Sequence, residues 1–342
     1  MPSHPCPRIG VLGAGAWGTA LANLAAQPRA KTTEPRVLIW ARDPAHVAEM
    51  TAAGANARYL PGVPMRPNVT PVADPAILTG AEFVLAAVPA QVMRQVLQVF
   101  APYIGGDAPI ILCAKGIEHA TGKFLSEVAR DVLPGNPRAI LSGPSFAKEV
   151  AQGLPAAVTL AAFDGSLAAA IAGRLAAPSF RLYSSSDVRG VEVGGAAKNV
   201  LAIASGIAAG RGLGASAAAS LIARGFAELN RFGKAQGAMP ETLMGLSGLG
   251  DLVLTCTSPL SRNYSLGFAL GRGTTLADAL EHSGLCEGTS TCGVLLSLAK
   301  AKGIEMPVTA AVDAVLSEKI TIGDAIAELL ARPHKAEFVG EA

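Results

Sequence analysis

The first half of the chain alternates short apolar runs with longer segments of mixed polarity. Residues 83–88 form one such run, and the lack of polar positions in it is typical of a parallel strand buried on both faces. Similar runs occupy residues 9–12, 36–40, 109–113, 139–142, 156–162 and 180–184. Strands that alternate with helical segments predict a doubly wound, mostly parallel α/β sheet.

The pattern changes near Asp187, after which apolar positions recur at helical spacing. We expect one domain at residues 1–187 and an all-helical domain at residues 188–342. A chain of 342 residues is longer than one hydrophobic core usually serves, which agrees with two domains. Helices are predicted at residues 188–209, 215–237, 258–270, 276–282, 291–302, 308–317 and 322–331, and a frayed tail from residue 332.

Composition narrows the class of protein. Half of the residues are apolar and 16% are charged, which argues against disorder, and a net charge of +2 without a basic block argues against a nucleic-acid partner. The amino-terminus lacks the apolar segment of a signal peptide, and later apolar runs are broken before a membrane-spanning length. These features predict a soluble, cytoplasmic protein.

The cysteines give no sign of a disulfide framework or a metal site. Their number is odd and no C-x-x-C pair occurs, so we expect free thiols, a reducing compartment and no zinc. The five are Cys6, Cys113, Cys256, Cys286 and Cys292.

A glycine motif follows the first predicted strand. Gly13, Gly15 and Gly18 have the spacing G-x-G-x-x-G and precede a helix predicted from Thr19 to Gln27. The first glycine suits the tight turn, the second suits close approach of a pyrophosphate, and the third suits close packing of helix on strand. The helix amino-terminus would offer free N–H groups to the phosphates. The motif predicts a dinucleotide site, with a plain glycine-rich turn as the alternative.

The end of the second strand bears on which dinucleotide is bound. There an acidic residue suits a free 2′-hydroxyl, whereas an arginine suits a 2′-phosphate. Arg42 precedes Asp43, which favours NADP with NAD also accepted; Asp43 can equally cap the next helix. Tyr59 lies in a following loop that either contacts the cofactor or only turns the chain.

Two later strand exits carry candidate site residues. Lys115 follows the strand at residues 109–113, and Gly143 and Ser145 follow the strand at residues 139–142. Ligands of open α/β sheets bind at this edge, so Lys115 is predicted to reach a phosphate or substrate oxygen rather than only solvent. No histidine lies in a recognisable triad motif, so Ser145 is not interpreted as a hydrolase nucleophile.

The helical half contains a lysine in unusual surroundings. Lys198 is flanked by Gly, Ala and Val and follows Gly194 and Gly195, which indicate close approach of another backbone or a ligand. Desolvation would lower the pKa of this amine and suit it to act as a general base. A charge on Lys115 would act in the same direction and Asp251 would oppose it, which leaves the net shift open. Asp251 either caps a helical turn or orients Lys198 or the substrate.

A polar cluster opens a helix at residues 261–263. Ser261, Arg262 and Asn263 combine a hydroxyl, a guanidinium and an amide at a helix start, which suits an anion; the alternative is an N-cap with a surface arginine. Charges on the helix at residues 215–237 are expected on a solvated or interfacial face. They are Arg224, Glu228 and Arg231.

Six motifs in this order resemble the bacterial type of NAD(P)-dependent glycerol-3-phosphate dehydrogenase, from about residue 9 to about residue 331. They are residues 13–20, 114–116, 143–147, 195–199, 248–252 and 261–263. The resemblance implies a Rossmann domain followed by a helical substrate domain. It also implies interconversion of sn-glycerol 3-phosphate and dihydroxyacetone phosphate, which feeds glycerophospholipid synthesis, and a homodimer.

The resemblance also implies roles for individual residues. Lys198 matches the proton acceptor. The substrate contacts are Lys115, Gly143, Ser145, Lys198, Asp251, Ser261, Arg262 and Asn263. The cofactor contacts, with the three glycines of the motif, are Ala16, Trp17, Arg42, Tyr59, Lys115, Ala147, Arg262, Leu285 and Glu287. Ala16 replaces a serine common in the family, so one side-chain contact is lost.

Two other functions fit part of the pattern. A dehydrogenase of 3-hydroxy acids also pairs a dinucleotide domain with a helical domain, and its cluster at residues 261–263 would bind a carboxylate. A non-catalytic NAD(P) sensor would need only the glycine motif, and the lysines and Asp251 argue against it.

Overall fold

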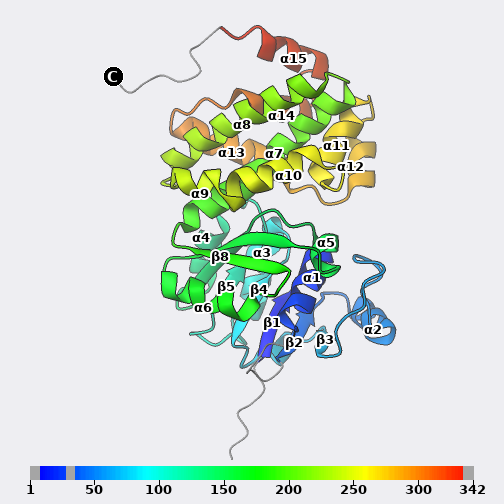
Figure 1. Ribbon diagram of the computed structural model, residues 1–342, viewed down its shortest axis with the longest axis vertical. Coiled ribbons are helices and arrows are strands. Elements are labelled where there is room, and N and C mark those ends of the chain that lie inside the picture. The colour runs from blue at the N-terminus through cyan, green and yellow to red at the C-terminus, as the bar shows by residue number, and fades with distance from the viewer. Residues whose placement is uncertain (1–7, 28–34, 334–342) are drawn as a thin grey trace, which may run out of the picture.

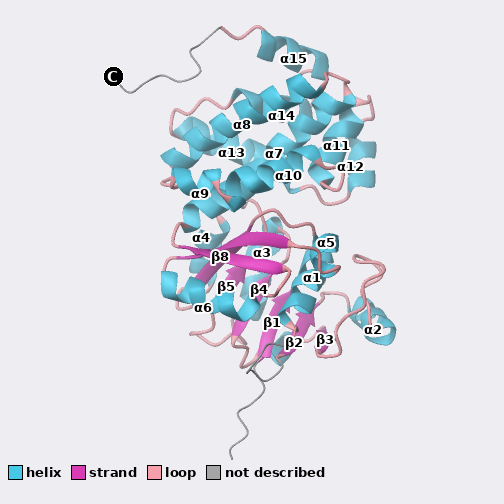
Figure 2. Cartoon of the chain, viewed as in Figure 1, coloured by secondary structure: helices cyan, strands magenta, loops and turns pink. Residues whose placement is uncertain are grey.

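The computed structural model describes residues 8–27 and 35–333. Cys6, the predicted loop at residues 28–34 and most of the predicted tail lie outside these residues. The described chain forms two stacked halves, with all the strands in one half and only helices in the other (Figures 1 and 2). This confirms the predicted fold class of a Rossmann-type sheet followed by a helical region.

The sheet has eight strands in the order β3-β2-β1-β4-β5-β6-β7-β8. Every neighbouring pair is parallel except β6 and β7. The strands are β1 Arg8–Leu12, β2 Arg36–Trp40, β3 Val69–Val72, β4 Phe83–Ala86, β5 Ile110–Leu112, β6 Arg138–Ser142, β7 Ala156–Ala162 and β8 Phe180–Ser185. The sequence did not predict β3, because its four residues include Thr and Pro rather than a continuous apolar run.

Helices cover both faces of the sheet, and each face has its own buried core. One core joins the sheet to α1, α5 and α6, and the other joins it to α3, α4 and the first turn of α7. The helices of this half are α1 Ala16–Ala25, α2 Pro44–Ala53, α3 Met93–Phe100, α4 Leu125–Val132, α5 Ala147–Ala151 and α6 Gly165–Leu175, with short turns η1 Pro75–Leu78 and η2 Ala90–Val92.

The other half is organised around α7, whose side chains are almost all buried by α8, α10, α11 and α13 (Figure 1). Its helices are α7 Val188–Gly210, α8 Ala215–Ala235, α9 Pro240–Met244, α10 Asp251–Thr257, α11 Arg262–Gly271, α12 Leu276–Ser283, α13 Glu287–Ala301, α14 Pro307–Leu316 and α15 Ile322–Leu330. A π-helical turn, η3 Leu246–Gly250, replaces the glycine-rich turn expected before Asp251.

Glycines bring α7 and α11 into backbone contact. A Cβ at Gly206 would collide with the carbonyl of Tyr264, and a Cβ at Gly267 would collide with the carbonyl of Ile203. The two helices therefore cross at a separation that side chains would not allow. This crossing places the amino-terminus of α11, and with it Arg262, against the central helix.

α7 is long and apolar enough to cross a bilayer by length and composition, which the sequence reading did not anticipate. In the structure 94% of its apolar window is buried inside the molecule, as in the core helix of a soluble protein. The bent pair of segments Pro240–Thr257 and Arg262–Gly271 passes the same test only if the two are counted together.

Glu228 departs from the solvated or interfacial face expected for the charges of α8. Its side chain is buried and accepts hydrogen bonds from the backbone N–H groups of Val308 and Thr309 at the start of α14, and from the Thr309 hydroxyl. Arg224 and Arg231, by contrast, are exposed. The spacing of apolar residues along α8 did not predict the burial of Glu228, because the helix amino-terminus that Glu228 caps lies 80 residues later in the sequence.

Candidate functional site

The glycine motif forms a turn whose three glycines have different surroundings. Gly13 has φ of +105°, and a Cβ at Gly18 would collide with the Gly13 carbonyl. A Cβ at Gly15 would meet no atom within 4 Å, so the turn is open there. These are the surroundings predicted for a tight turn, a close helix–strand contact and an approach path for a pyrophosphate.

Helix α1 begins at Ala16, three residues earlier than expected, and its N-cap Gly15 offers no side-chain cap. Ala16 and Trp17 therefore supply the first helical N–H groups, which point towards the open side of the turn. Ala147, the first residue of α5, belongs to the same cluster of partly buried apolar side chains as Ala16 and Trp17. The residues of this group fit a bound dinucleotide diphosphate.

Asn56 braces the turn, and sequence reasoning missed it. Its buried amide donates to the Ala14 carbonyl and to the Thr19 hydroxyl, both at 2.8 Å. Its oxygen lies 3.0 Å from the ring nitrogen of His46, which packs against the half-exposed ring of Tyr59. Asn56 thus joins the glycine turn to the Tyr59 loop. An asparagine inside a predicted loop carried no signal that distinguished it from a turn residue.

Asp43 and Arg42 take different roles after β2. The Asp43 carboxylate caps α2 by accepting from the N–H of Ala45 and pairs with Arg58 at 3.3 Å. The hydrogen bond from Ala45, followed by Arg58, lowers the pKa of Asp43 despite some desolvation. Arg42 is exposed and forms no ion pair with any described residue. Its guanidinium is therefore available at this edge of the site.

One carboxylate joins two lysines from different parts of the chain. Asp251 accepts from Lys115 at 2.7 Å through one oxygen and from Lys198 at 2.5 Å through the other. Lys115 comes from the exit of β5, Lys198 from the middle of α7, and Asp251 from the first residue of α10. Gly250 occupies the N-cap position of α10, so Asp251 does not cap this helix, and its carboxylate contacts Lys198 directly.

The amine of Lys198 is almost completely buried, with 7% of its side chain exposed. Burial lowers its pKa to about 7, with Asp251 opposing this shift and the charge of Lys115 adding to it. The net direction left open by the sequence is therefore downward. The amine also bonds the hydroxyl of Thr255 at 2.9 Å. Thr255 was missed, although its place one turn after Asp251 puts both side chains on one helix face.

Close packing of α7 on the sheet makes this meeting possible. A Cβ at Gly195 would lie 2.9 Å from the Ser142 hydroxyl and 3.4 Å from Cγ of Lys115. A Cβ at Gly194 would lie only 2.5 Å from the Ser247 carbonyl. The glycine pair therefore admits the β5 and β6 exits on one side of α7 and the π-helical turn on the other.

The exit of β6 supplies a second partner for Lys115. The Lys115 amine donates to the carbonyl of Gly143 at 3.1 Å, and the Ser145 hydroxyl donates to the same carbonyl at 3.0 Å. Gly143 has φ of +149°, and a Cβ there would lie 2.8 Å from Cα of Val158. The carbonyl is thus fixed by a backbone conformation that favours glycine.

Two of the three residues in the predicted anion cluster have structural partners. Ser261 is the N-cap of α11 and accepts from the N–H of Tyr264. The buried amide of Asn263 donates to Asn199 and accepts from the N–H of Gly288, so it ties α7, α11 and α13 together. Arg262 is exposed, and its guanidinium forms no ion pair with the described residues. It is the residue of the cluster that is free to take an anion.

Glu287 connects the two halves. It is the first residue of α13, not part of a preceding turn as expected, and it accepts from the N–H of Ala90 at the β4 exit at 3.0 Å. Burial raises its pKa, while the Ala90 hydrogen bond and the nearby Arg262 lower it. Leu285, two residues earlier, is 47% exposed.

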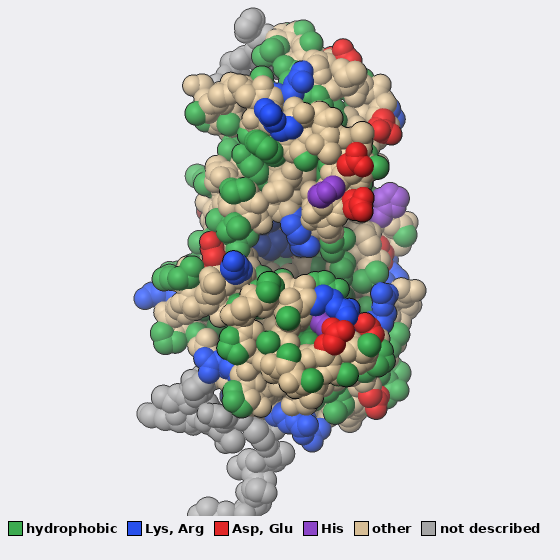
Figure 3. All heavy atoms as spheres, turned by 90° about the vertical axis from the view of Figure 1, so that its right-hand side faces the viewer, with side chains coloured by type: hydrophobic (Ala, Val, Ile, Leu, Met, Phe, Trp, Pro, Cys, Tyr) green, Lys and Arg blue, Asp and Glu red, His purple; other side chains and the backbone are tan. Residues whose placement is uncertain are grey.

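Contacts link the glycine turn to the lysine centre. Gly13 lies against Ala87 and Val88 after β4, the same loop reaches Glu287 at Ala90, and Glu287 lies beside Gly116. In the space-filling view the surface is hollowed between the two halves, and Lys and Arg side chains lie in the hollow (Figure 3). The described residues contain no cluster of three or more side chains suited to a metal ion. The cysteines among them, Cys113, Cys256, Cys286 and Cys292, are free and buried.

The chain matches two family models in succession. Residues 8–168 match the NAD-dependent glycerol-3-phosphate dehydrogenase N-terminus, and residues 187–327 match the C-terminus of the same family.

Individual relatives agree with these models. The chain is 62% identical over 333 residues to a glycerol-3-phosphate dehydrogenase (NAD(P)+) of Beijerinckia indica, covering 97% of this chain and 98% of that protein. It is 55% identical to one of Azorhizobium caulinodans, covering 96% and 98%. A crystal structure of glycerol-3-phosphate dehydrogenase from Coxiella burnetii superposes with a TM-score of 0.90 at 40% identity, covering 96% and 99%. The chain therefore belongs to the NAD-dependent glycerol-3-phosphate dehydrogenase family, an oxidoreductase family that uses NAD(P).

Proposed function

We propose that this chain interconverts sn-glycerol 3-phosphate and dihydroxyacetone phosphate, with Lys198 as the group that takes and returns the C2 hydroxyl proton. The observation that carries the proposal is the pair of lysines on Asp251, one of them with a pKa of about 7, beside a dinucleotide turn. A base with a pKa near the working pH serves proton transfer in both directions.

In the oxidation direction, neutral Lys198 accepts the proton of the C2 hydroxyl group. When bound, the nicotinamide supplies the hydride chemistry, and the protein supplies position and electrostatic field. Asp251 holds the Lys198 amine in place, and its negative charge stabilises the ammonium that forms as the proton arrives. In the reduction direction, the Lys198 ammonium returns this proton to the oxygen at C2.

Lys115 is proposed to contact a substrate oxygen. Two of its three N–H donors bond Asp251 and Gly143, which leaves one donor for a ligand, and 18% of its side chain is exposed. Its positive charge also favours the neutral form of Lys198. Ser145 and the backbone at Gly143 complete this wall of the proposed substrate site.

The substrate phosphate is proposed to bind at the start of α11. Arg262 offers a guanidinium there that forms no ion pair with a described residue, and a guanidinium binds phosphate through two parallel hydrogen bonds. Ser261 and Asn263 hold the helix start in position through their own hydrogen bonds. Their contribution to the phosphate would then be largely indirect.

We propose that the dinucleotide lies along Gly13, Gly15, Ala16, Trp17, Gly18 and Ala147, with Arg42 and Tyr59 at the adenosine end and Leu285 and Glu287 on the helical side. Arg42 is available for a 2′-phosphate while Asp43 is engaged with Ala45 and Arg58, which supports a preference for NADPH with NADH accepted. Domains at residues 1–187 and 188–342, a cytoplasmic homodimer without membrane insertion and a role in glycerophospholipid synthesis complete the proposal.

The test is a direct assay of dihydroxyacetone phosphate reduction, followed by nicotinamide absorbance with NADPH and with NADH. We expect turnover with both cofactors and a higher kcat/KM for NADPH than for NADH. Dihydroxyacetone without phosphate should react poorly. Turnover of a 3-hydroxy acid in place of glycerol 3-phosphate, or tight NADPH binding without any turnover, would contradict the proposal.

A further inference from the structure

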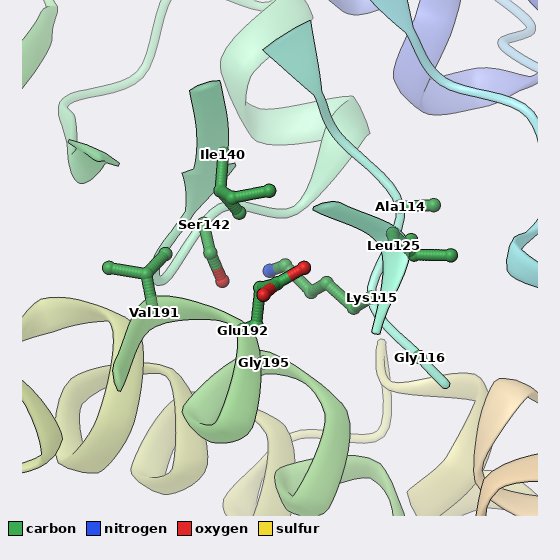
Figure 4. A pocket seen from close by; sticks show the side chains of 9 residues that line it. All are labelled: Ala114, Lys115, Gly116, Leu125, Ile140, Ser142, Val191, Glu192 and Gly195. Atoms are coloured by element: carbon green, nitrogen blue, oxygen red, sulfur yellow. The ribbon is translucent and has the colours of Figure 1, made fainter. Parts of the chain in front are cut away.

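A small cavity lies beside Lys115, between the exits of β5 and β6 and the first turns of α7. Its volume is about 10 Å³, close to that of one water-sized sphere. Polar groups from three elements face it: Lys115 after β5, Ser142 at the end of β6 and Glu192 on α7. In Figure 4 the Ser142 hydroxyl, the Lys115 amine and the Glu192 carboxyl group point towards the same space.

The buried hydroxyl of Ser142 lacks a hydrogen-bond partner among the described residues. Only 3% of Ser142 is exposed to solvent. Buried hydroxyl groups are normally hydrogen-bonded, either to protein or to an ordered water. Gly195 leaves room in front of it, because a Cβ there would lie 2.9 Å from the hydroxyl oxygen. The cavity thus combines space for one water with a group that requires one.

Glu192 places a buried carboxyl group on the same cavity. Its oxygens accept from the N–H and the hydroxyl of Ser126 at the start of α4, at 2.7 and 2.8 Å. Arg189 on its own helix lies 3.7 Å away and pairs more closely with Glu127 of α4. Burial raises the pKa of Glu192 to about 7, against the hydrogen bonds from Ser126 and the charge of Arg189, and with Glu127 adding to the rise.

We propose that this cavity binds one water molecule between Ser142 and Glu192, and that Glu192 is a positioning residue that acts through it on Lys115 and Lys198. The inference rests on the proposed role of Lys198. Each carboxylate oxygen keeps a lone pair beyond its bond to Ser126, and the water would satisfy the Ser142 hydroxyl at the same time. No proton transfer through the water is required, since the effect is electrostatic.

The sign of the effect follows from the charge. An ionised Glu192 stabilises the ammonium form of nearby lysines and therefore raises the pKa of Lys198. The two residues are six positions apart on α7, which is about 9 Å along the helix axis. At that separation one charge shifts a pKa by about 0.3 to 1 unit, depending on the local dielectric.

The first test compares pH–rate profiles of the wild-type enzyme and Glu192→Gln, which keeps the side-chain shape and an acceptor for Ser126. The variant should move the acid limb for glycerol 3-phosphate oxidation to lower pH by about 0.3 to 1 unit. It should move the alkaline limb for the reverse reaction in the same direction. Ser142→Ala should give a smaller shift of the same sign, because loss of the water leaves the Glu192 carboxylate less solvated and therefore less ionised.

Glu228→Gln is the matched control. Glu228 is also a buried carboxyl whose pKa burial raises and which accepts from a helix start, but it lies on α8 against the start of α14, outside the site. Its replacement should leave both limbs in place, even where it lowers stability. Profiles of Glu192→Gln and Ser142→Ala that coincide with the wild type would overturn the inference. Full activity of Lys198→Ala would instead refute the proposed function.

The second test does not depend on turnover. A high-resolution crystal structure of the full chain should show one ordered water within hydrogen-bond distance of the Ser142 hydroxyl and the Glu192 carboxyl group. The same water should disappear or shift in crystals of Ser142→Ala. A well-ordered cavity without density for a water in the wild type would overturn the proposed water site.

Discussion

The glycine turn and the lysine centre are built in different ways. The turn, residues 13–18, offers backbone N–H groups and an open space beside Gly15, and its residues lie within six positions of one another. The lysine centre works through three side chains, and Asp251 follows Lys115 by 136 residues and Lys198 by 53. Local sequence specifies the first, whereas the packing of the two halves specifies the second.

This difference predicts different consequences of substitution in the two regions. A substitution in the turn should change cofactor affinity, because the turn would bind the cofactor through its backbone shape. A change in the lysine centre alters protonation while leaving the backbone intact. Substitutions in the two regions should therefore affect different measured constants.

The largest effect is expected for Lys198→Ala. Loss of the base should lower kcat by about 10²–10⁴-fold in both directions, since general acid–base catalysis typically contributes that much. NADPH affinity, measured by fluorescence titration, should remain near the wild-type value because the glycine turn is untouched. Lys198→Arg should be equally inactive, because a guanidinium remains protonated at neutral pH.

Lys300→Ala is the control for this substitution, because Lys300 is an exposed lysine on α13. It should keep wild-type kcat. Activity of Lys198→Ala within about tenfold of the wild type would exclude the amine as the base.

The next largest effect is expected for Arg262→Ala, which tests whether the substrate phosphate binds at the start of α11. Loss of a charge-assisted bidentate contact should raise KM for dihydroxyacetone phosphate by about 10–100-fold and largely abolish the preference over dihydroxyacetone. Arg272→Ala, an exposed arginine at the other end of α11, should change neither constant. If the preference for the phosphorylated substrate survives in Arg262→Ala, the anion binds elsewhere.

The sequence predicted the first region better than the second. Residues 13–18 carry their own geometry, and the exits of β5 and β6 follow from the edge rule for parallel sheets. The contact between Lys198 and Asp251 was left as one of several possible roles, because the local sequence does not indicate which face of α10 is buried. Thr255, Asn56 and Glu192 were missed for the same reason, since each bonds a segment distant in sequence. Glu228 was misplaced because it caps a helix that begins 80 residues later.

The third prediction separates folding from cofactor binding within the turn. In Gly18→Ala the new Cβ would collide with the Gly13 backbone, so we expect destabilisation by about 1–3 kcal/mol and loss of NADPH binding. Gly15→Ala is the matched control: Gly15 has φ of −77° and an open surrounding, so its stability should stay within about 0.5 kcal/mol. NADPH affinity should nevertheless fall in Gly15→Ala. Equal thermal unfolding midpoints for the two variants would show that the turn tolerates both methyl groups alike.

The smallest effect is a shift in pH dependence, and it tests how the two lysines interact. Burial holds the pKa of Lys198 at about 7, and the charge of Lys115 contributes to this lowering. Lys115→Met keeps most of the stem but removes the charge, so the pKa of Lys198 should rise by about one unit. The acid limb of glycerol 3-phosphate oxidation should then move to higher pH, and the alkaline limb of the reverse reaction should move the same way.

The direction of this shift distinguishes the electrostatic role of Lys115 from substrate binding. Loss of a substrate contact alone would raise KM and leave the limbs of the kcat profile in place. Lys148→Met, an exposed lysine on α5, controls for the loss of one positive charge from the surface. An acid limb that stays at its wild-type position in Lys115→Met would mean that the charge of Lys115 does not lower the pKa of Lys198. The low pKa of Lys198 would then arise from burial alone, and the lysine centre would depend on packing even more strongly than its hydrogen bonds suggest.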